Sequence, residues 1–421
     1  MARFFGVPMR NGVALGVAST LPMRGGLPVP ALNLDFLSGA LDSRITFTRG
    51  STATFFDSTG TLQSAAINAA RFDHNPSTLA PLGLLIEEQR QNLLLQSGWA
   101  GATSGTPGAA PTSWTVGFGT NTVTTVLTSN FDPTANAVKF DCDSGERVMF
   151  QQAINVTNGV QYALSAYLEA VSGVIGDGLF VVAGTATVTQ NTFVTSPSTP
   201  GRYTILFTAT GTGTVTVRVG VGTSATVGAT VSATWSHPQV EAGAFATSYI
   251  PTTTTALTRN ADVASMTGTN FSSWFNPTAS TLYAEWTNIA AAIPSGGSQV
   301  ICEISDGTTS NFYRVFQSQV VGTKASTNMF SGGVNPGRLD SGGAYSNATV
   351  KAASAFAASD RAISANGNAA TTSATGALPI NVNRMNIGAE AALTNFINGT
   401  IRRVSYYPRR LPDSTLQALT A

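Results

Sequence analysis

The sequence predicts an all-β protein that contains two β-sandwich domains. Short runs rich in valine, threonine and aromatic residues recur along the chain, and turn residues separate them at intervals of roughly 8–12 residues, a spacing typical of sandwiches. Hydrophobic residues make up 43% of the 421 residues, which excludes general disorder. Charged residues make up only 10%, so we expect strand surfaces rich in hydroxyl groups. This length suffices for two or three domains with cores of their own.

The charge balance and the cysteines exclude several kinds of function. The formal net charge of +1 gives no electrostatic reason to expect nucleic acid or an anionic membrane as a partner. No run approaches the roughly 20 apolar residues of a membrane-spanning helix, so membrane insertion is not expected. Cys142 and Cys302 are the two cysteines of the chain and lie far apart. We expect two small buried side chains there, and neither a disulfide framework nor a metal site.

The first segment, residues 1–30, contains glycine, proline and methionine without clear periodicity. Such a segment cannot bury a core by itself. We therefore expect an extended N-terminal anchor that docks onto a larger assembly.

The second segment, residues 31–95, is predicted to be a β-rich module. Residues 45–49 alternate like a half-buried strand, and residues 53–62 indicate a strand, a turn and a second strand. Two apolar strands are expected at 84–86 and 93–95, on either side of a polar stretch. In that stretch Glu87 and Arg90 are expected to pair with each other or with Arg71 and Asp73. Catalysis by Glu87 with its neighbour Glu88 is disfavoured, because adjacent strand residues point to opposite faces.

Residues 96–260 and 261–421 are each predicted to form a sandwich. In the first, the expected strands lie at residues 138–140, 148–152, 162–168, 203–208 and 215–221. In the second, they lie at residues 282–286, 299–305, 312–316, 362–365 and 386–388. True internal repeats of a fixed period are not evident.

The closing segment begins with Asn398-Gly399, a strong turn signal because both positions favour positive φ. In the strand that follows, Ile401, Val404 and one or both of Tyr406 and Tyr407 are expected to be buried while arginines face water. Pro408 cannot donate to the ladder and should end the strand. A short helix is expected over residues 412–419.

Three stretches resemble known sequence patterns. Residues 71–97 (RFDHNPSTLAPLGLLIEEQRQNLLLQS) resemble a module of tailed-bacteriophage fibre, spike and minor virion proteins. The matching residues are Arg71, Phe72, Asp73, Pro76, Gly83, Leu84, Leu85, Ile86, Glu87, Arg90, Asn92, Leu93 and Leu94. Residues 238–252 (PQVEAGAFATSYIPT) resemble the final strand of jelly-roll carbohydrate-binding-like domains. Residues 398–411 (NGTIRRVSYYPRRL) are similar to the last core strand of concanavalin A-like (laminin-G-like) sandwiches.

The resemblance implies a structural protein on the exterior of a phage particle, a fibre or spike on tail or head. It further implies attachment to other virion proteins through residues 1–30, a homo-oligomer (commonly a trimer), and adhesion to host-surface polysaccharide without enzymatic activity. Two alternatives stay open. One is a tail-spike-type polysaccharide depolymerase, which would be marked by repeated β-helix rungs and a carboxylate pair. The other is a purely structural capsid or tail decoration without a receptor.

Few residues are candidates for a site. No catalytic residue is assigned, because His74 and His237 lie in different domains and no serine–histidine–aspartate triad can be assembled. No cofactor or metal is expected, although residues 141–146 superficially resemble a calcium loop and leave open an edge site for Ca²⁺. Trp114, in a loop-like stretch, is a weak candidate for an exposed sugar-stacking ring. Arginines of the closing strand could bind an acidic polysaccharide, or line a subunit interface or a solvent face. They are Arg402, Arg403, Arg409 and Arg410.

Overall fold

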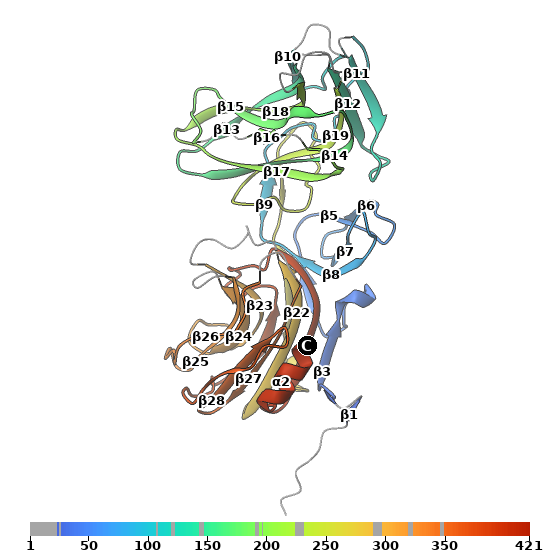
Figure 1. Cartoon of the computed structure of the whole chain (residues 1–421). Helices are drawn as coiled ribbons and strands as arrows, with labels where there is room; N and C mark the ends of the chain where they lie inside the picture. Colours follow the sequence, from blue (N-terminus) through green and yellow to red (C-terminus); the bar gives the residue numbers. More distant parts are fainter. Residues whose placement is uncertain are drawn as a thin grey trace, which may run out of the picture.

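The computed structural model confirms the all-β prediction and shows two sandwich lobes, one above the other (Figure 1). It describes residues 23–24, 27–106, 108–118, 123–142, 147–189, 193–195, 197–223, 231–288, 297–318, 323–345 and 349–421. Most of the expected N-terminal anchor therefore lies outside the described residues. Of that segment, the short strands β1 (Met23–Arg24) and β2 (Leu27–Pro28) form a two-stranded ribbon.

The upper lobe packs two five-stranded antiparallel sheets face to face. The first runs in the order β10 (Thr115–Phe118), β13 (Arg147–Val156), β18 (Gly213–Thr223), β15 (Ile175–Ala183), β16 (Phe193–Thr195). The second runs in the order β11 (Val123–Thr128), β12 (Asn136–Cys142), β19 (Val231–Ala242), β14 (Gln161–Ser172), β17 (Gly201–Thr208). All ten strands lie within residues 96–260, and they include every strand expected there. Alternating apolar residues from both sheets fill the core between them.

The lower lobe packs a seven-stranded sheet against an eight-stranded sheet. The first runs in the order β26 (Leu339–Asp340), β25 (Lys324–Phe330), β24 (Phe312–Ser318), β23 (Ser298–Ser305), β30 (Arg384–Ile387), β21 (Val263–Thr267), β4 (Thr46–Thr48). The second contains β29 (Thr371–Ser373), β28 (Asp360–Ala365), β27 (Thr349–Ala357), β22 (Ala279–Asn288), β31 (Gly399–Tyr407), β8 (Pro81–Ile86), β7 (Phe72–His74), with β3 (Leu32–Asp35) also paired to β31.

Strands from residues 31–95 are thus built into both sheets of the lower lobe. β4 pairs with β21 in one sheet, and β3 and β8 pair with β31 in the other. The hairpin of β5 (Ala53–Phe56) and β6 (Leu62–Ala65) lies between the two lobes (Figure 1). The segment expected as a module before the sandwiches therefore contributes part of the second sandwich.

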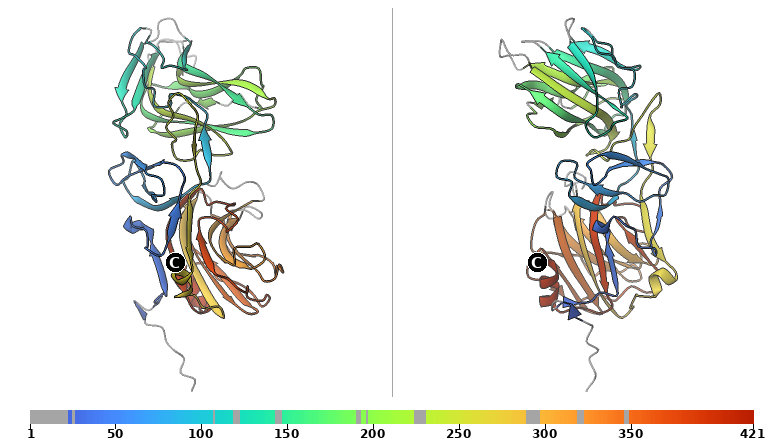
Figure 2. Two further views of the ribbon diagram at one scale, coloured as in Figure 1. Left: turned by 180° about the vertical axis from the view of Figure 1, so that it is seen from behind. Right: turned by 90° about the vertical axis from the view of Figure 1, so that its right-hand side faces the viewer.

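The connection between the lobes is a short antiparallel ribbon. β9 (Arg90–Asn92) leads up into the upper lobe and β20 (Leu257–Arg259) returns from it, with Asn92 directly opposite Leu257. Both views in Figure 2 show the upper lobe joined to the lower one at this place. The strand expected at residues 93–95 is wrong by a few positions, because the backbone of Arg90–Asn92 finds its partner in β20 and Leu94 turns into the upper core instead.

The C-terminal expectations are confirmed. β31 begins at Gly399, buries Ile401, Val404, Tyr406 and Tyr407, and ends before Pro408. Helix α2 (Asp413–Thr420) follows and buries Leu416 against β27 and β28 on the outer face of the eight-stranded sheet. The remaining helical elements are the single turns η1 (Phe36–Ser38) and α1 (Thr269–Ser272), within the described residues.

Candidate functional site

Five charged side chains from distant parts of the sequence form a buried network below the upper lobe. Asp262 pairs with Arg49 (3.0 Å) and Arg71 (2.5 Å), and Glu87 pairs with Arg71 (2.9 Å) and Arg259 (3.5 Å). All five side chains are almost fully buried. Burying such ions is tolerable only when each is paired and hydrogen-bonded, so this network defines one arrangement of the strands that carry it.

The network and its neighbours also form hydrogen bonds with the upper lobe. Glu87 accepts hydrogen bonds from the amide (2.7 Å) and the hydroxyl (2.6 Å) of Ser248, which lies in the segment after β19. Asn92 donates to the carbonyl of Ile250 (2.8 Å) and accepts from the amide of Val240 (3.1 Å). Arg90 pairs with Glu88 (2.5 Å). The expected pairing of Glu87 with Arg71 is confirmed, whereas Arg90 pairs with Glu88 and not with Glu87.

The pKa values of two acidic side chains near this contact, Glu87 and Asp73, are shifted in opposite directions. Burial alone would raise the pKa of Glu87, but Arg259, Arg71 and the hydrogen bonds from Ser248 lower it to about 2. Burial raises the pKa of Asp73 to about 6, against the lowering effect of a hydrogen bond from the amide of Phe56 (2.8 Å). At neutral pH Glu87 is therefore ionised, whereas Asp73 gains or loses its proton near pH 6.

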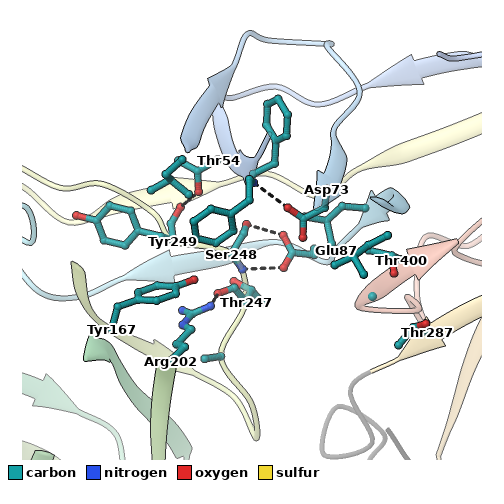
Figure 3. A pocket seen from close by; sticks show the side chains of 17 residues that line it. Thr54, Asp73, Glu87, Tyr167, Arg202, Thr247, Ser248, Tyr249, Thr287 and Thr400 are labelled. Carbon is teal, nitrogen blue, oxygen red and sulfur yellow. Dashed lines mark hydrogen bonds between the residues drawn. The ribbon is translucent and has the colours of Figure 1, made fainter. Parts of the chain in front are cut away.

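A hollow opens beside the network, where the β5–β6 hairpin, the upper lobe and the edge of the lower lobe meet, and Figure 3 shows the smaller of its two parts. It has two parts, of about 230 Å³ and about 530 Å³. Both parts are lined by Phe56, Asp73, Leu82, Tyr167 and Arg202. We call this hollow the junction groove. The volume of the larger part falls within the roughly 300–1,000 Å³ of small-molecule sites.

Arg202 and Tyr167 form the wall contributed by the upper lobe. Arg202 donates to the carbonyl of Thr247 (2.5 Å) and the hydroxyl of Ser165 (3.0 Å), and its guanidinium lies 5.3 Å from the centre of the Tyr167 ring. Burial raises the pKa of the Tyr167 phenol, which therefore stays neutral. Neither residue was anticipated from the sequence, since an arginine after a turn glycine and a tyrosine in an apolar strand are ordinary β features.

The aromatic residue expected to be exposed is buried. Trp114 is 5% exposed, packs edge-on against Trp99 (6.1 Å between ring centres), and donates its indole N–H to the carbonyl of Leu95 (2.7 Å). The expectation of exposure is therefore wrong, because the preceding turn folds the ring back onto the core. The other four tryptophans, Trp99, Trp235, Trp274 and Trp286, are buried as well.

The two histidines lie apart and occupy structural positions. His74 donates from Nδ1 to the carbonyl of Phe56 (3.2 Å) at the groove, and His237 is buried against Asp132 (3.1 Å) in the upper lobe. In the part of the chain that the structure describes, no group of three or more histidine, cysteine, aspartate or glutamate side chains could hold a metal ion. Four of the six residues of the calcium-like stretch, 143–146, lie outside that part. Both cysteines are buried.

Arginines of the closing strand are paired with carboxylates of the same chain. Arg402 contacts Glu285 (3.4 Å) and Arg403 contacts Asp35 (3.3 Å). Arg410 contacts Asp360 (2.9 Å) and Asp413 (2.6 Å), and Arg409 is half-buried beside it. No helix among the described residues is long and apolar enough to cross a membrane.

Comparison with known proteins gives weak similarities. No family model and no curated protein matches the chain. Among solved structures, the CBM40 domain of a Ruminococcus gnavus sialidase bound to α2,3-sialyllactose is 15% identical, covering 35% of this chain and 84% of that one, with a TM-score of 0.30. The NanB sialidase of Streptococcus pneumoniae is 10% identical over 37% of this chain and 26% of its own, with a TM-score of 0.30. A Trypanosoma rangeli sialidase is 10% identical over 70% and 61%, with a TM-score of 0.29. Similarities this low do not bear on function, and the fold class rests on the strands described above.

Proposed function

We propose that this chain is a structural protein on the exterior of a tailed-phage particle, a fibre or spike that adheres to host-surface polysaccharide. The observation that carries the proposal is where the phage-like motif of residues 71–97 lies. Four of its charged and amide residues, Arg71, Glu87, Arg90 and Asn92, contact the segment of the upper lobe that follows β19. A protein that projects from a particle and bears load needs such a fixed coupling between its domains.

Adhesion to polysaccharide is supported by the surface between the lobes. The junction groove combines partly exposed apolar groups with amides and hydroxyls, the mixture that suits a sugar with an apolar face and polar edges. In this proposal residues 1–30 attach the chain to other virion proteins, and the protein assembles as a homo-oligomer, with a trimer favoured.

The depolymerase alternative has one observation in its favour. Asp73 and Glu87 line the same part of the groove with pKa values pushed apart, as in acid and base pairs of glycosidases. Against it, the Glu87 carboxylate is almost fully buried and its two oxygens accept hydrogen bonds from Ser248, while arginines neutralise it. A carboxylate held in this way is poorly placed to attack a sugar or activate water, so we favour a non-enzymatic role.

The test measures binding and chemistry together. Purified protein is incubated with encapsulated bacteria and with matched capsule-deficient mutants, and bound protein and released reducing sugar are quantified in the same samples. Capsule-dependent binding without sugar release supports adhesion. Release of sugar would replace adhesion by hydrolysis, and equal absence of binding to both strains would favour a purely structural decoration.

A further inference from the structure

We propose that the junction groove binds a neutral segment of polysaccharide and discriminates against acidic sugars. This inference rests on the proposed adhesive function and adds both the place of contact and the class of glycan. It follows from the charges and hydrogen-bonding groups that line the groove, taken one set at a time.

The basic side chains in the groove are already engaged. Arg202 donates to Thr247 and Ser165 and lies over the ring of Tyr167, so its guanidinium is held against the wall. His74 uses Nδ1 for the carbonyl of Phe56. Bidentate recognition of a carboxylate or sulfate by arginine uses two N–H groups of one guanidinium, and Nη1 and Nη2 of Arg202 already donate to Thr247 and Ser165.

The acidic side chains outnumber the basic ones. Asp73, Glu87 and Glu169 line the groove, against Arg202 and His74 among the described lining residues. Arg71 and Arg259 compensate Glu87 internally. Asp73 and Glu169 line the hollow, and among the residues that the structure describes neither forms an ion pair with a basic side chain. Glu169 instead accepts from the hydroxyl of Ser129 (2.6 Å) and the amide of Asn130 (2.8 Å). An incoming uronate or sulfate would meet like charge here, which disfavours it.

The remaining groups suit a neutral sugar. Asn75, Ser77 and Asn130 stand at the rim of the larger part, where Ser77 and Asn130 are exposed and Asn75 is half-buried. Half-buried Leu82 and Phe131 provide apolar surface between them. Sugar hydroxyls can exchange hydrogen bonds with the amides and carboxylates, while the C–H face of the ring packs on the apolar residues.

The decisive experiment changes charge without changing shape. Full-length protein is titrated calorimetrically with neutral hexose oligosaccharides and with uronate-containing oligosaccharides of equal length. The wild type is expected to bind the neutral series and not the acidic one. The double variant combines Asp73→Asn, which keeps the oxygen that accepts from the amide of Phe56, with Glu169→Gln, whose oxygen can accept from the amide of Asn130 while its NH2 donates to the hydroxyl of Ser129. It should gain measurable affinity for the acidic series while retaining the neutral one.

A second variant tests the place of contact. Asn130→Ala removes an exposed amide from the rim and should weaken neutral binding about tenfold, the effect of one well-made hydrogen bond. Thr372→Ala, an exposed position in β29 far along the lower lobe, is the matched control and should change nothing. Equal melting temperatures would exclude unfolding as the cause.

Three results would overturn the inference while leaving adhesion in place. They are tighter wild-type binding of acidic than of neutral oligosaccharides, unchanged affinity in Asn130→Ala, and binding of neither series by protein that binds encapsulated cells. Failure to bind any encapsulated cells would instead remove the proposed function on which the inference rests.

Discussion

Arg71 donates hydrogen bonds to groups that belong to separate stretches of the chain. Its guanidinium contacts the carbonyl of Thr54, the hydroxyl of Ser248, and the carboxylates of Asp262 and Glu87. A planar group with five donors in fixed directions can hold several acceptors at once, which a lysine could not. The arginine therefore connects the β5–β6 hairpin, the upper lobe and the lower lobe at one point.

Replacing Arg71 by alanine should be strongly destabilising. The change leaves Glu87 and Asp262 buried with one cation fewer each, and breaking a buried pair costs about 3–5 kcal/mol. Arg403→Ala is the control, because Arg403 pairs with Asp35 at a half-exposed position and such pairs contribute about 0–1 kcal/mol. Urea denaturation of both variants measures the difference. A loss below about 1 kcal/mol for Arg71→Ala would contradict the structural role assigned to the network.

The raised pKa of Asp73 makes stability depend on pH in a defined direction. An acid whose folded pKa of about 6 exceeds its unfolded value favours the folded state while protonated, so its effect on stability is lost as pH rises from about 4 through 6. Asp73→Asn removes this titration. We expect the variant to gain about 2 kcal/mol over the wild type between pH 4 and pH 7.5.

Glu87 acts in the opposite sense and in a different window. Its pKa of about 2 lies below its unfolded value, so the stability it contributes is present above about pH 4.5 and is lost as pH falls toward 2. Asp73→Asn should leave this acid limb unchanged. A stability difference between variant and wild type that stayed constant from pH 4 to 7.5 would show that Asp73 has an ordinary pKa.

The sequence predicted part of this residue-scale picture. The sequence suggested that Glu87 pairs with Arg71, because both residues lie in the stretch 71–97. The contribution of Asp262 and Arg49 could not be predicted, since it depends on β4 and β21 being neighbours in a sheet. The prediction that Trp114 is exposed was wrong for a related reason. A local turn pattern indicates a loop, but only the packing of Trp99 beneath it decides whether the ring faces water.

At the scale of elements, the pairing of β8 with β31 joins the phage-like stretch to the lower lobe. Gly83 in β8 has φ of +105°, and a Cβ built there would lie 2.3 Å from the carbonyl oxygen of Ile401 in β31. The two backbones approach too closely for any side chain. The glycine of the motif is therefore required by the contact between strands, and its place in the sequence pattern has a steric explanation.

Gly83→Ala should separate the two strands and destabilise the protein by clearly more than the roughly 1–2 kcal/mol of backbone strain alone, because a clash with Ile401 adds to that strain. Gly39→Ala is a matched control, since Gly39 also has positive φ (+70°) but has open space where the Cβ would lie. The control should lose only the backbone strain of about 1–2 kcal/mol. Thermal unfolding of both variants compares them. Equal losses would mean that β8 and β31 separate at no cost.

Element types were largely predictable, and element partners were not. The alternation that predicted strands such as 162–168 and 215–221 reflects burial on one face, which the local sequence determines. No local sequence pattern determines which strands pair. Asn33 and Ser405, whose side chains are 2.7 Å apart, are separated by 372 positions. Residues 31–95 therefore looked like a module, although their strands complete the lower lobe.

At the scale of the whole molecule, the upper lobe is an insertion within the lower one. Strands β3, β4 and β8 precede it in the chain, β21 to β31 follow it, and both sets share the same two sheets. The chain enters the upper lobe through β9 and leaves it through β20, and these two strands pair side by side. Proteins tolerate inserted domains whose ends meet in this way, so we expect the lower lobe to keep its fold when the upper lobe is removed.

Deleting residues 93–256 and joining Asn92 to Leu257 through a two-residue Asn-Gly turn should give a protein that still folds. These two residues already face each other across an antiparallel ribbon, so a tight turn can close it. The variant loses the bonds from Ser248 to Glu87 and should be less stable than the parent, but Arg71 and Arg259 still neutralise Glu87. Residues 261–421 alone should not fold, because β31 would lose β3 and β8, and β21 would lose β4. Circular dichroism and urea unfolding of both proteins test these two expectations. Cooperative unfolding of the fragment 261–421 would show that it forms a stable sandwich without the early strands. An unfolded deletion variant would show that the lower lobe depends on its insertion.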